Sequence, residues 1–139
     1  AGEGIPVTLA ISLHAPNNEL RNQLMPINRR YPIGKLMEAC REYIKVTNRR
    51  VTFEYILIEG VNDSKKEARE LVELLKGLLC HVNLIPMNLV QERKYRPAQE
   101  DAVERFSHAL EGVGISTTLR RKMGADIHGA CGQLRMRTL

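Results

Sequence analysis

Hydrophobic positions along the chain follow two alternating patterns, one typical of strands and one of helices. Four short apolar runs rich in β-branched residues predict strands at residues 7–13 (VTLAISL), 51–58 (VTFEYILI), 81–86 (HVNLIP) and 115–119 (ISTTL). The first run is bounded by two prolines and is predicted to be a buried strand. Its alternation places Thr8, Ala10, Ser12 and His14 on one face.

Between these runs the apolar side chains recur at helical spacing. They predict a short helix over 17–24, with Asn17 or Asn18 as its cap, and longer helices over 34–47, after Ser64 and from Pro97. Ser64 and Glu67 form a capping-box pattern. The apolar stripes expected to face inward on the last two helices are Ala68, Leu71, Val72, Leu75, Leu78 and Leu79, then Ala102, Val103, Phe106, Ala109, Leu110 and Val113.

The alternation of strands and helices predicts an α/β fold with parallel strands and helical crossovers. Four strands do not close a barrel, so the sheet is either open or a portion of a larger barrel. The chain starts at Ala1 without a Met and enters a strand almost at once, which favours the second alternative. We therefore expect residues 1–139 to form one domain that is the C-terminal portion of a partial TIM-like barrel.

Polar residues follow the first and third predicted strands, where α/β proteins bind ligands. Ser12, Leu13 and His14 end the first strand, and Asn88 follows the third. Their polar side chains can hydrogen-bond a ribose, a carboxylate or an adenine edge, although strand ends also become polar simply on meeting solvent. Glu54 lies within the second strand, either inside a barrel lumen or at an exposed sheet edge.

Charge and composition narrow the function classes. The formal net charge is +5, and basic residues pair at Arg29–Arg30, Arg49–Arg50 and 120–122, with Arg135 and Arg137 near the end. Such clusters attract phosphate backbones, although charge alone favours an ordinary solvated surface. No apolar run is long enough for a membrane span, and the default expectation is a cytoplasmic protein. Zinc spacings and glycine-rich phosphate loops are absent from the sequence.

The chain contains three cysteines, an odd count without regular spacing, which argues against a disulfide framework. Cys40 and Cys80 fall on apolar patterns and are interpreted as core residues. Cys131 is flanked by small residues and lies close in sequence to Arg120 and Arg121, an environment that suits a nucleophilic thiol. His128 lies three residues earlier, so a Cys–His pair is considered too, and an incidental cysteine remains the alternative.

Five segments in order resemble one family, the radical-SAM methyltransferases that modify C2 of an adenine in 23S ribosomal RNA and, in some bacteria, in tRNA. The segments are residues 11–17 (ISLHAPN), 25–28 (MPIN), 60–63 (GVND), 83–88 (NLIPMN) and 130–134 (ACGQL). The resemblance extends over nearly the whole chain. It implies a partial radical-SAM (β/α) barrel that uses S-adenosylmethionine and a 4Fe–4S cluster, and an electron donor such as flavodoxin.

The resemblance also assigns roles to individual residues. Ser12, Leu13, His14 and Asn88 are expected to contact S-adenosylmethionine, and Cys131 is expected to carry a methyl group as S-methylcysteine. In the family, the thiolate takes this methyl group by displacement. A 5′-deoxyadenosyl radical then removes a hydrogen from it, and the carbon radical adds to C2 of adenine. A second cysteine resolves the protein–RNA adduct.

Some features of the family are absent from this sequence. The CxxxCxxC cluster motif and the resolving cysteine are not found, so we expect no metal ligands in this chain and no activity from it alone. The family's Asp-Ile-Asp-Ala-Ala segment is Asp126-Ile127-His128-Gly129-Ala130 here. Three alternatives stay open: an adenine C8 methyltransferase, against which Pro86 argues; a non-catalytic RNA-binding fragment; and a stand-alone thiol enzyme.

Overall fold

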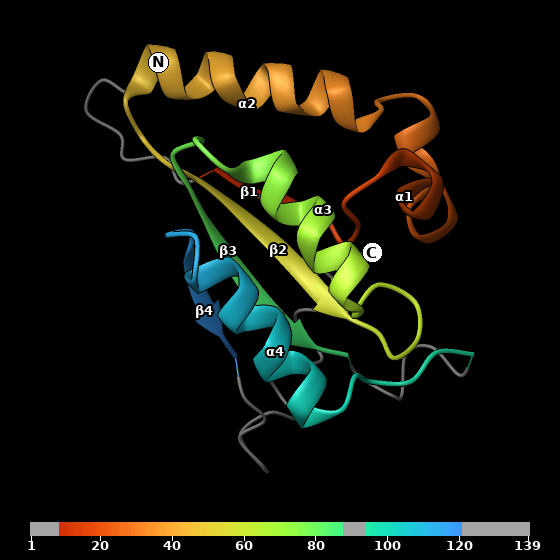
Figure 1. Cartoon of the computed structure of the whole chain (residues 1–139). Coiled ribbons are helices and arrows are strands. Elements are labelled where there is room, and N and C mark those ends of the chain that lie inside the picture. The colour runs from red at the N-terminus through yellow and green to blue at the C-terminus, as the bar shows by residue number, and fades with distance from the viewer. Residues whose placement is uncertain (1–8, 88–93, 121–139) are drawn as a thin grey trace, which may run out of the picture.

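The computed structural model describes residues 9–87 and 94–120 of the chain. Strands and helices alternate along these residues, as Figure 1 shows. The elements are β1 (Leu9–Ser12), α1 (Asn18–Leu24), the 3-10 helix η1 (Pro26–Arg29), α2 (Ile33–Thr47), β2 (Val51–Leu57), α3 (Lys65–Leu75), β3 (Cys80–Pro86), α4 (Glu100–Glu111) and β4 (Ser116–Leu119).

The four strands form a single sheet in the order β1-β2-β3-β4, and every neighbouring pair is parallel. Each connection between neighbouring strands contains at least one helix. The predicted α/β class with parallel strands and helical crossovers is therefore confirmed. All four strands end at the same edge of the sheet, which is the edge where the sequence placed its candidate ligand residues.

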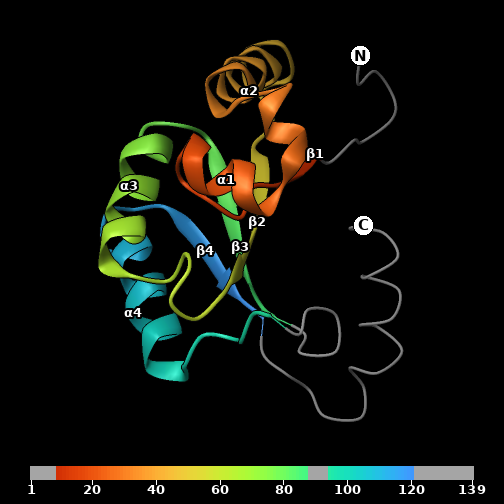
Figure 2. The ribbon, with the colours of Figure 1, turned by 90° about the vertical axis from the view of Figure 1, so that its right-hand side faces the viewer.

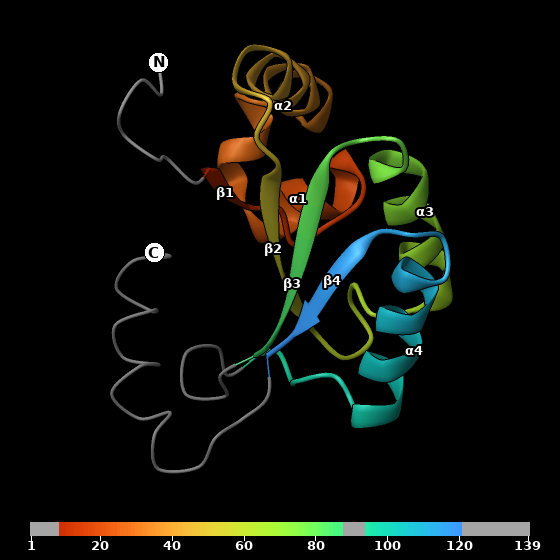
Figure 3. The same cartoon turned by 90° about the vertical axis from the view of Figure 1, so that its left-hand side faces the viewer.

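Helices α3 and α4 lie side by side over one face of the sheet, as Figures 2 and 3 show from opposite sides. Helix α2 packs near β1 and contributes Met37 and Cys40 to the same core. The core is aliphatic apart from Phe53, Tyr55 and Phe106, and the rings of Tyr55 and Phe106 lie 5.1 Å apart between centroids. Removal of this apolar surface from water is the main contribution to the stability of the folded chain.

Helix starts follow local sequence signals. Asn17 caps α1 by accepting a hydrogen bond from the Leu20 amide, as expected. Ser64 and Glu67 form a complete capping box at the start of α3. At the other end of a helix, Asn48 adopts a left-handed conformation (φ 59°) and ends α2, a position where asparagine is among the few tolerated residues.

Several expectations were wrong in detail. The first strand is not buried: Ala10 is exposed because β1 lies at the edge of the described sheet. Helix α4 starts at Glu100 rather than at Pro97, which instead forms an isolated bridge with Ile58. Three residues that were expected to face inward are exposed. Leu79 and Val113 lie beyond the ends of α3 and α4, and Ala109 lies on the solvent side of α4. Among the described residues, no helix has the length and apolar character needed to cross a membrane.

Candidate functional site at the carboxyl edge of the sheet

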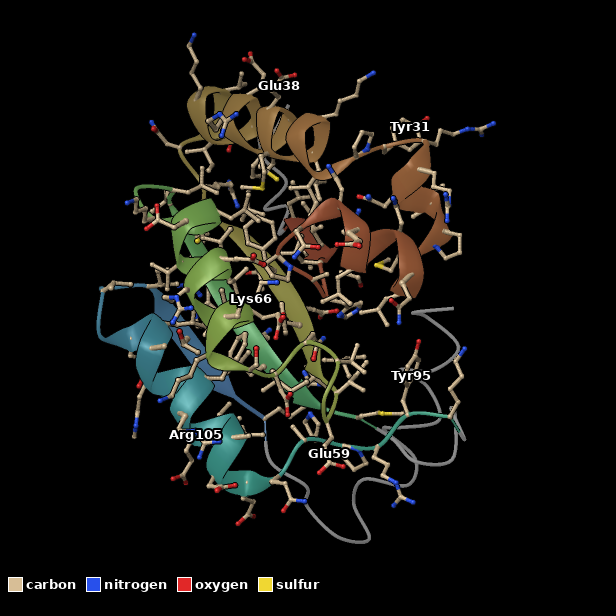
Figure 4. The ribbon with its side chains drawn as sticks, turned by 45° about the vertical axis from the view of Figure 1, so that its right-hand side comes forward. Tyr31, Glu38, Glu59, Lys66, Tyr95 and Arg105 are labelled. Carbon is tan, nitrogen blue, oxygen red and sulfur yellow. The ribbon has the colours of Figure 1, made fainter. Side chains whose placement is uncertain are left out.

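The carboxyl edge of the sheet brings together three segments of the family resemblance: ISLHAPN, GVND and NLIPMN. Ser12 ends β1, followed by Leu13 and His14, and the turn with Asn62 follows β2. Glu59 lies at this end of β2, well away from Glu38 on α2 (Figure 4). The other two predicted site residues, Asn88 and Cys131, lie outside the described residues.

His14 leaves the strand in a left-handed backbone conformation, with φ of 60°. Its ring Nδ1 accepts a hydrogen bond of 3.0 Å from the amide of Ile56 on β2. Burial lowers the pKa of His14 to about 4, and the nearby charge of Arg21 acts in the same direction. The imidazole is therefore neutral at physiological pH and carries its proton on Nε2.

Arg21 on α1 fixes the segment that leads to His14. Its guanidinium is buried and donates to the carbonyls of Leu13 (3.0 Å) and Ser12 (2.9 Å) and to Oδ1 of Asn28 (2.8 Å). The side-chain amide of Asn28 in turn donates to Asn18 and Asn22. Local pattern does not distinguish this arginine from the exposed ones. The available signal is the MPIN segment, because its Asn28 is the buried acceptor.

Asn62 joins the ends of β1 and β2. It is fully buried, and its Nδ2 donates to the carbonyls of His14 and Ile56, each at 2.8 Å. Its Oδ1 accepts from the amide of Ile58 at 2.7 Å. The sequence marks this residue only as part of the GVND segment, because local pattern does not predict a side-chain link between two strand ends.

The face of the sheet opposite α3 and α4 carries polar side chains along its middle, followed by Ile56 and Ile85 at the carboxyl end. The register aligns Ser12, Glu54, Asn83 and Thr118 in one row across all four strands. Glu54 is half-buried on an interior strand, so the expected alternative of a sheet-edge position is wrong. Two residues before Asn83 on the same strand, His81 contacts Ser116 and Thr118 through its two ring nitrogens, both at 2.6 Å. This cluster was missed because it needs the β3–β4 register.

The two cysteines in the described part of the chain are structural. Cys40 and Cys80 are buried, and desolvation raises the pKa of both thiols, that of Cys80 to about 11. Buried, protonated thiols are poor nucleophiles, so the interpretation of both as core residues is confirmed. No group of three or more metal-ligating side chains occurs within residues 9–87 and 94–120. The residues described here therefore do not fit an iron–sulfur cluster.

A groove of about 1300 Å³ lies along α3 and α4 and extends to Asn17 after β1 and Asp63 before α3. Lys66 and Arg105, labelled on these helices in Figure 4, both line it. Apolar side chains and charged side chains of both signs line it. Ser12, Leu13 and His14 do not line this groove, although Pro16 and Asn17 of the same segment do.

The basic pairs within the described residues do not gather at one place. Arg49 and Arg50 are exposed just before β2, at the amino edge of the sheet. Arg120 is exposed just after β4, at the carboxyl edge, while Arg29 and Arg30 are exposed at the end of η1. Of the described basic pairs, only the one that begins with Arg120 directly follows a strand at the edge that holds His14.

Comparison with known proteins bears directly on the resemblance. A probable dual-specificity RNA methyltransferase RlmN of Caldanaerobacter subterraneus subsp. tengcongensis is 60% identical over 139 residues, which is 100% of this chain and 41% of that protein. A protein with the same description from Symbiobacterium thermophilum is 60% identical over 99% of this chain and 37% of its own length. Along its whole length, the chain is therefore similar to proteins described as RlmN. No protein-family model matches it.

The structural comparison agrees with this similarity. The crystal structure of a radical SAM methyltransferase from Sphaerobacter thermophilus superposes with a TM-score of 0.87 and 54% identity, over 95% of this chain and 39% of that one. A domain of pyruvate-formate lyase-activating enzyme from Bacteroides vulgatus, at 18% identity and a TM-score of 0.64, shares the fold alone. The predicted partial radical-SAM barrel is confirmed. The chain spans 41% or less of the length of these RlmN relatives.

Proposed function

We propose that this chain is part of a radical-SAM enzyme that methylates C2 of adenine in 23S ribosomal RNA and also acts on tRNA. The observation that carries the proposal is 60% identity, along the whole chain, to a protein described as a dual-specificity RNA methyltransferase. A cytoplasmic location belongs to the proposal because both RNA substrates are there. Reduction of a cluster would require an electron donor such as flavodoxin.

Ser12, Leu13, His14 and Asn88 are proposed to bind S-adenosylmethionine. The position of the first three at the carboxyl edge of a parallel sheet supports this role. The open sheet face beside them offers the groups that an amino-acid and ribose ligand needs: the Ser12 hydroxyl, the Glu54 carboxylate and the Asn83 amide share one row. The proposed role of these residues is to hold and orient the cofactor; Leu13, fully buried with its amide and carbonyl already bonded, would act through the position of its neighbours.

S-adenosylmethionine supplies the methyl group and, together with a reduced 4Fe–4S cluster, the radical character that methylation of an electron-poor carbon needs. The cluster ligands are proposed to come from outside this chain, since its three cysteines lack the CxxxCxxC spacing. Within the chain, Cys131 is proposed to be the methyl-carrying residue. The support is its place in the ACGQL segment and its small neighbours, which leave room around the sulfur.

A chimaera tests the proposal directly. The chain replaces the matching segment of the Caldanaerobacter relative, and the product is expressed in cells that lack adenine C2 methylation. We expect mass spectrometry of digested 23S RNA and tRNA to detect 2-methyladenosine. His14→Asn should reduce methylation, whereas His108→Asn, on the exposed face of α4, should not. Absence of any methyladenosine, with cofactor and cluster shown to be bound, would contradict the proposal.

The same digestion separates the alternatives. Detection of 8-methyladenosine instead would establish the C8 type; Pro86 at the end of β3 supports the C2 type. A non-catalytic RNA-binding role would show as no modification together with RNA binding that weakens steeply with added salt. The scattered positions of the described basic pairs give this last alternative little support.

A further inference from the structure

The hydrogen-bond ladder between β1 and β2 changes acceptor at its last step. The Leu13 amide still donates to the carbonyl of Glu54, at 2.9 Å, as in a regular parallel ladder. In that ladder the next amide, Ile56, would donate to the Leu13 carbonyl, just as Arg120 donates to Leu84 between β4 and β3. Here the Ile56 amide donates to the ring Nδ1 of His14 instead, at 3.0 Å.

Arg21 binds the Leu13 carbonyl, which the Ile56 amide leaves without a donor. Its Nε donates to Leu13 O at 3.0 Å, so no backbone group is left without a partner by the change. The imidazole thus stands in the place of a backbone carbonyl at the end of β1. This geometry requires His14 to hold a φ of 60°, which costs a residue with a side chain of its size free energy unless its surroundings impose it.

Asn62 is hydrogen-bonded to the His14 backbone in this conformation. Its Nδ2 donates both to the carbonyl of His14 and to the carbonyl of Ile56, the same residue whose amide reaches the His14 ring. Its Oδ1 accepts from the Ile58 amide, and its own carbonyl accepts from the Tyr55 hydroxyl at 2.9 Å. A fully buried amide with every hydrogen-bonding atom used has one orientation available to it.

We propose that Asn62 is a positioning residue for S-adenosylmethionine: it fixes His14 as the tautomer whose Nδ1 is occupied by the Ile56 amide, so that the ring offers only Nε2–H to the cofactor. This inference rests on the proposed function. It specifies the recognition chemistry, because the cofactor atom that meets the ring must be an acceptor: a carboxylate oxygen, a ribose oxygen or an adenine nitrogen. Burial and Arg21 keep the pKa of His14 low, which agrees with a ring that never becomes a double donor.

The first test observes the ring itself, without any ligand. The chain has four histidines, so selective ¹⁵N labelling gives few ring signals, and His14→Asn identifies those of His14. We expect an unprotonated, hydrogen-bonded Nδ1 and a protonated Nε2. In Asn62→Ala both signals should move toward values averaged between tautomers. Asn62→Asp provides a second variant, since it keeps an acceptor for Ile58 and replaces the donor amide with an accepting oxygen.

Two control variants test whether the change in the His14 signals is specific to the loss of the Asn62 side chain. Tyr55→Phe removes a different hydrogen bond to Asn62, and Asp63→Ala removes the neighbouring side chain that accepts from the Gly60 amide at 3.0 Å. Neither should shift the His14 signals. In the cluster-loaded chimaera, the Kd for S-adenosylmethionine should rise about tenfold in both Asn62 variants and stay unchanged in both controls.

The outcomes separate the two claims. Unchanged His14 signals in Asn62→Ala and Asn62→Asp would show that Asn62 does not hold the ring, and would overturn the inference. Altered signals with an unchanged Kd would overturn its functional half, because the cofactor would then not use the fixed ring. A chimaera that binds no S-adenosylmethionine, while the ring of His14 keeps its fixed tautomer, would contradict the proposed function instead.

Discussion

Arg21 and Asn28 form a buried hydrogen bond of 2.8 Å that joins two segments of the family resemblance. Asn28 belongs to the MPIN segment, and Arg21 carries the link on to the backbone of Ser12 and Leu13. Neither residue is expected to touch the cofactor. Their pairing explains physically why the short helices after β1 contain specific polar residues: these side chains hold the strand end in place.

Removal of Arg21 should therefore destabilise the fold strongly. Arg21→Met leaves two carbonyls and the Asn28 amide oxygen without their donor, and we expect the free energy of unfolding to fall by about 3 kcal/mol. Arg105→Met is the control, because that arginine is exposed in an ion pair with Asp101 at 3.3 Å and should change stability by less than about 0.5 kcal/mol. Urea unfolding measures both. Equal effects would contradict the structural role given to Arg21.

The protonation of His14 should make the fold sensitive to mild acid. The unfolded chain takes up this proton as the pH falls through about 6.5, whereas the folded chain takes it up only near a pKa of about 4. The unfolded state therefore binds more protons between these values, and stability should fall as the pH falls across this window, by about 2 kcal/mol at pH 4.5. At pH 7 this side chain is neutral in the folded state and mostly neutral in the unfolded state, so the loss of stability has not yet begun.

His14→Asn should remove most of that slope while tolerating the left-handed backbone, which asparagine adopts readily. A smaller slope of the same sign should remain, because burial also lowers the pKa of His81. The measurement is the urea midpoint at several pH values for both proteins. The same slope in His14→Asn as in the unchanged chain would show that His14 is not the group responsible.

The capping box at the start of α3 should contribute measurably to stability. The Ser64 hydroxyl accepts from the Glu67 amide, and the Glu67 carboxylate accepts from the Ser64 amide at 3.1 Å. Ser64→Ala should lower the free energy of unfolding by about 1 kcal/mol. Gln99→Ala is the matched control, since Gln99 precedes α4 without making a side-chain capping bond. A larger loss from Gln99→Ala than from Ser64→Ala would refute this account.

The aromatic pair beneath the helices should be the most sensitive point of the core. Phe106 is 1% exposed and packs on Tyr55 at 5.1 Å between ring centroids. Phe106→Ala should cost about 3–5 kcal/mol through the cavity it leaves, and Phe106→Leu about 1 kcal/mol. Val113→Ala, at a side chain 55% exposed, should cost less than about 0.5 kcal/mol. Thermal or urea unfolding of the three variants gives the order directly.

Much of the fold follows from sequence pattern because its strands and helices are locally well marked. The predicted strand at 51–58 differs from β2 by one residue, and the capping box located the start of α3. The start of α4 could not be predicted in the same way. Pro97 is typical of a first helical turn, but here it pairs with Ile58, a contact between distant segments that the local sequence does not encode.

The same distinction applies to the candidate site: its location could be predicted, but the residues that hold it in place could not. Strand ends predicted the location of Ser12 and His14, because parallel strands bring polar endings to one edge. The residues that fix them could not be predicted, since Arg21 looks like any surface arginine and Asn62 like any turn residue. Their roles depend on burial and on hydrogen bonds between segments up to 48 residues apart. Polar residues with such long-range partners become visible only in the folded chain.

The most direct test of the central claim is the chemical state of Cys131. The chimaera is expressed with iron and S-adenosylmethionine available, and the peptide that contains Cys131 is analysed by mass spectrometry. Our account predicts added mass of one methylene on Cys131, absent from a Cys131→Ala variant. An unmodified thiol at full stoichiometry, in protein shown to hold both cofactor and cluster, would contradict the methyl-carrier role and with it the proposed reaction.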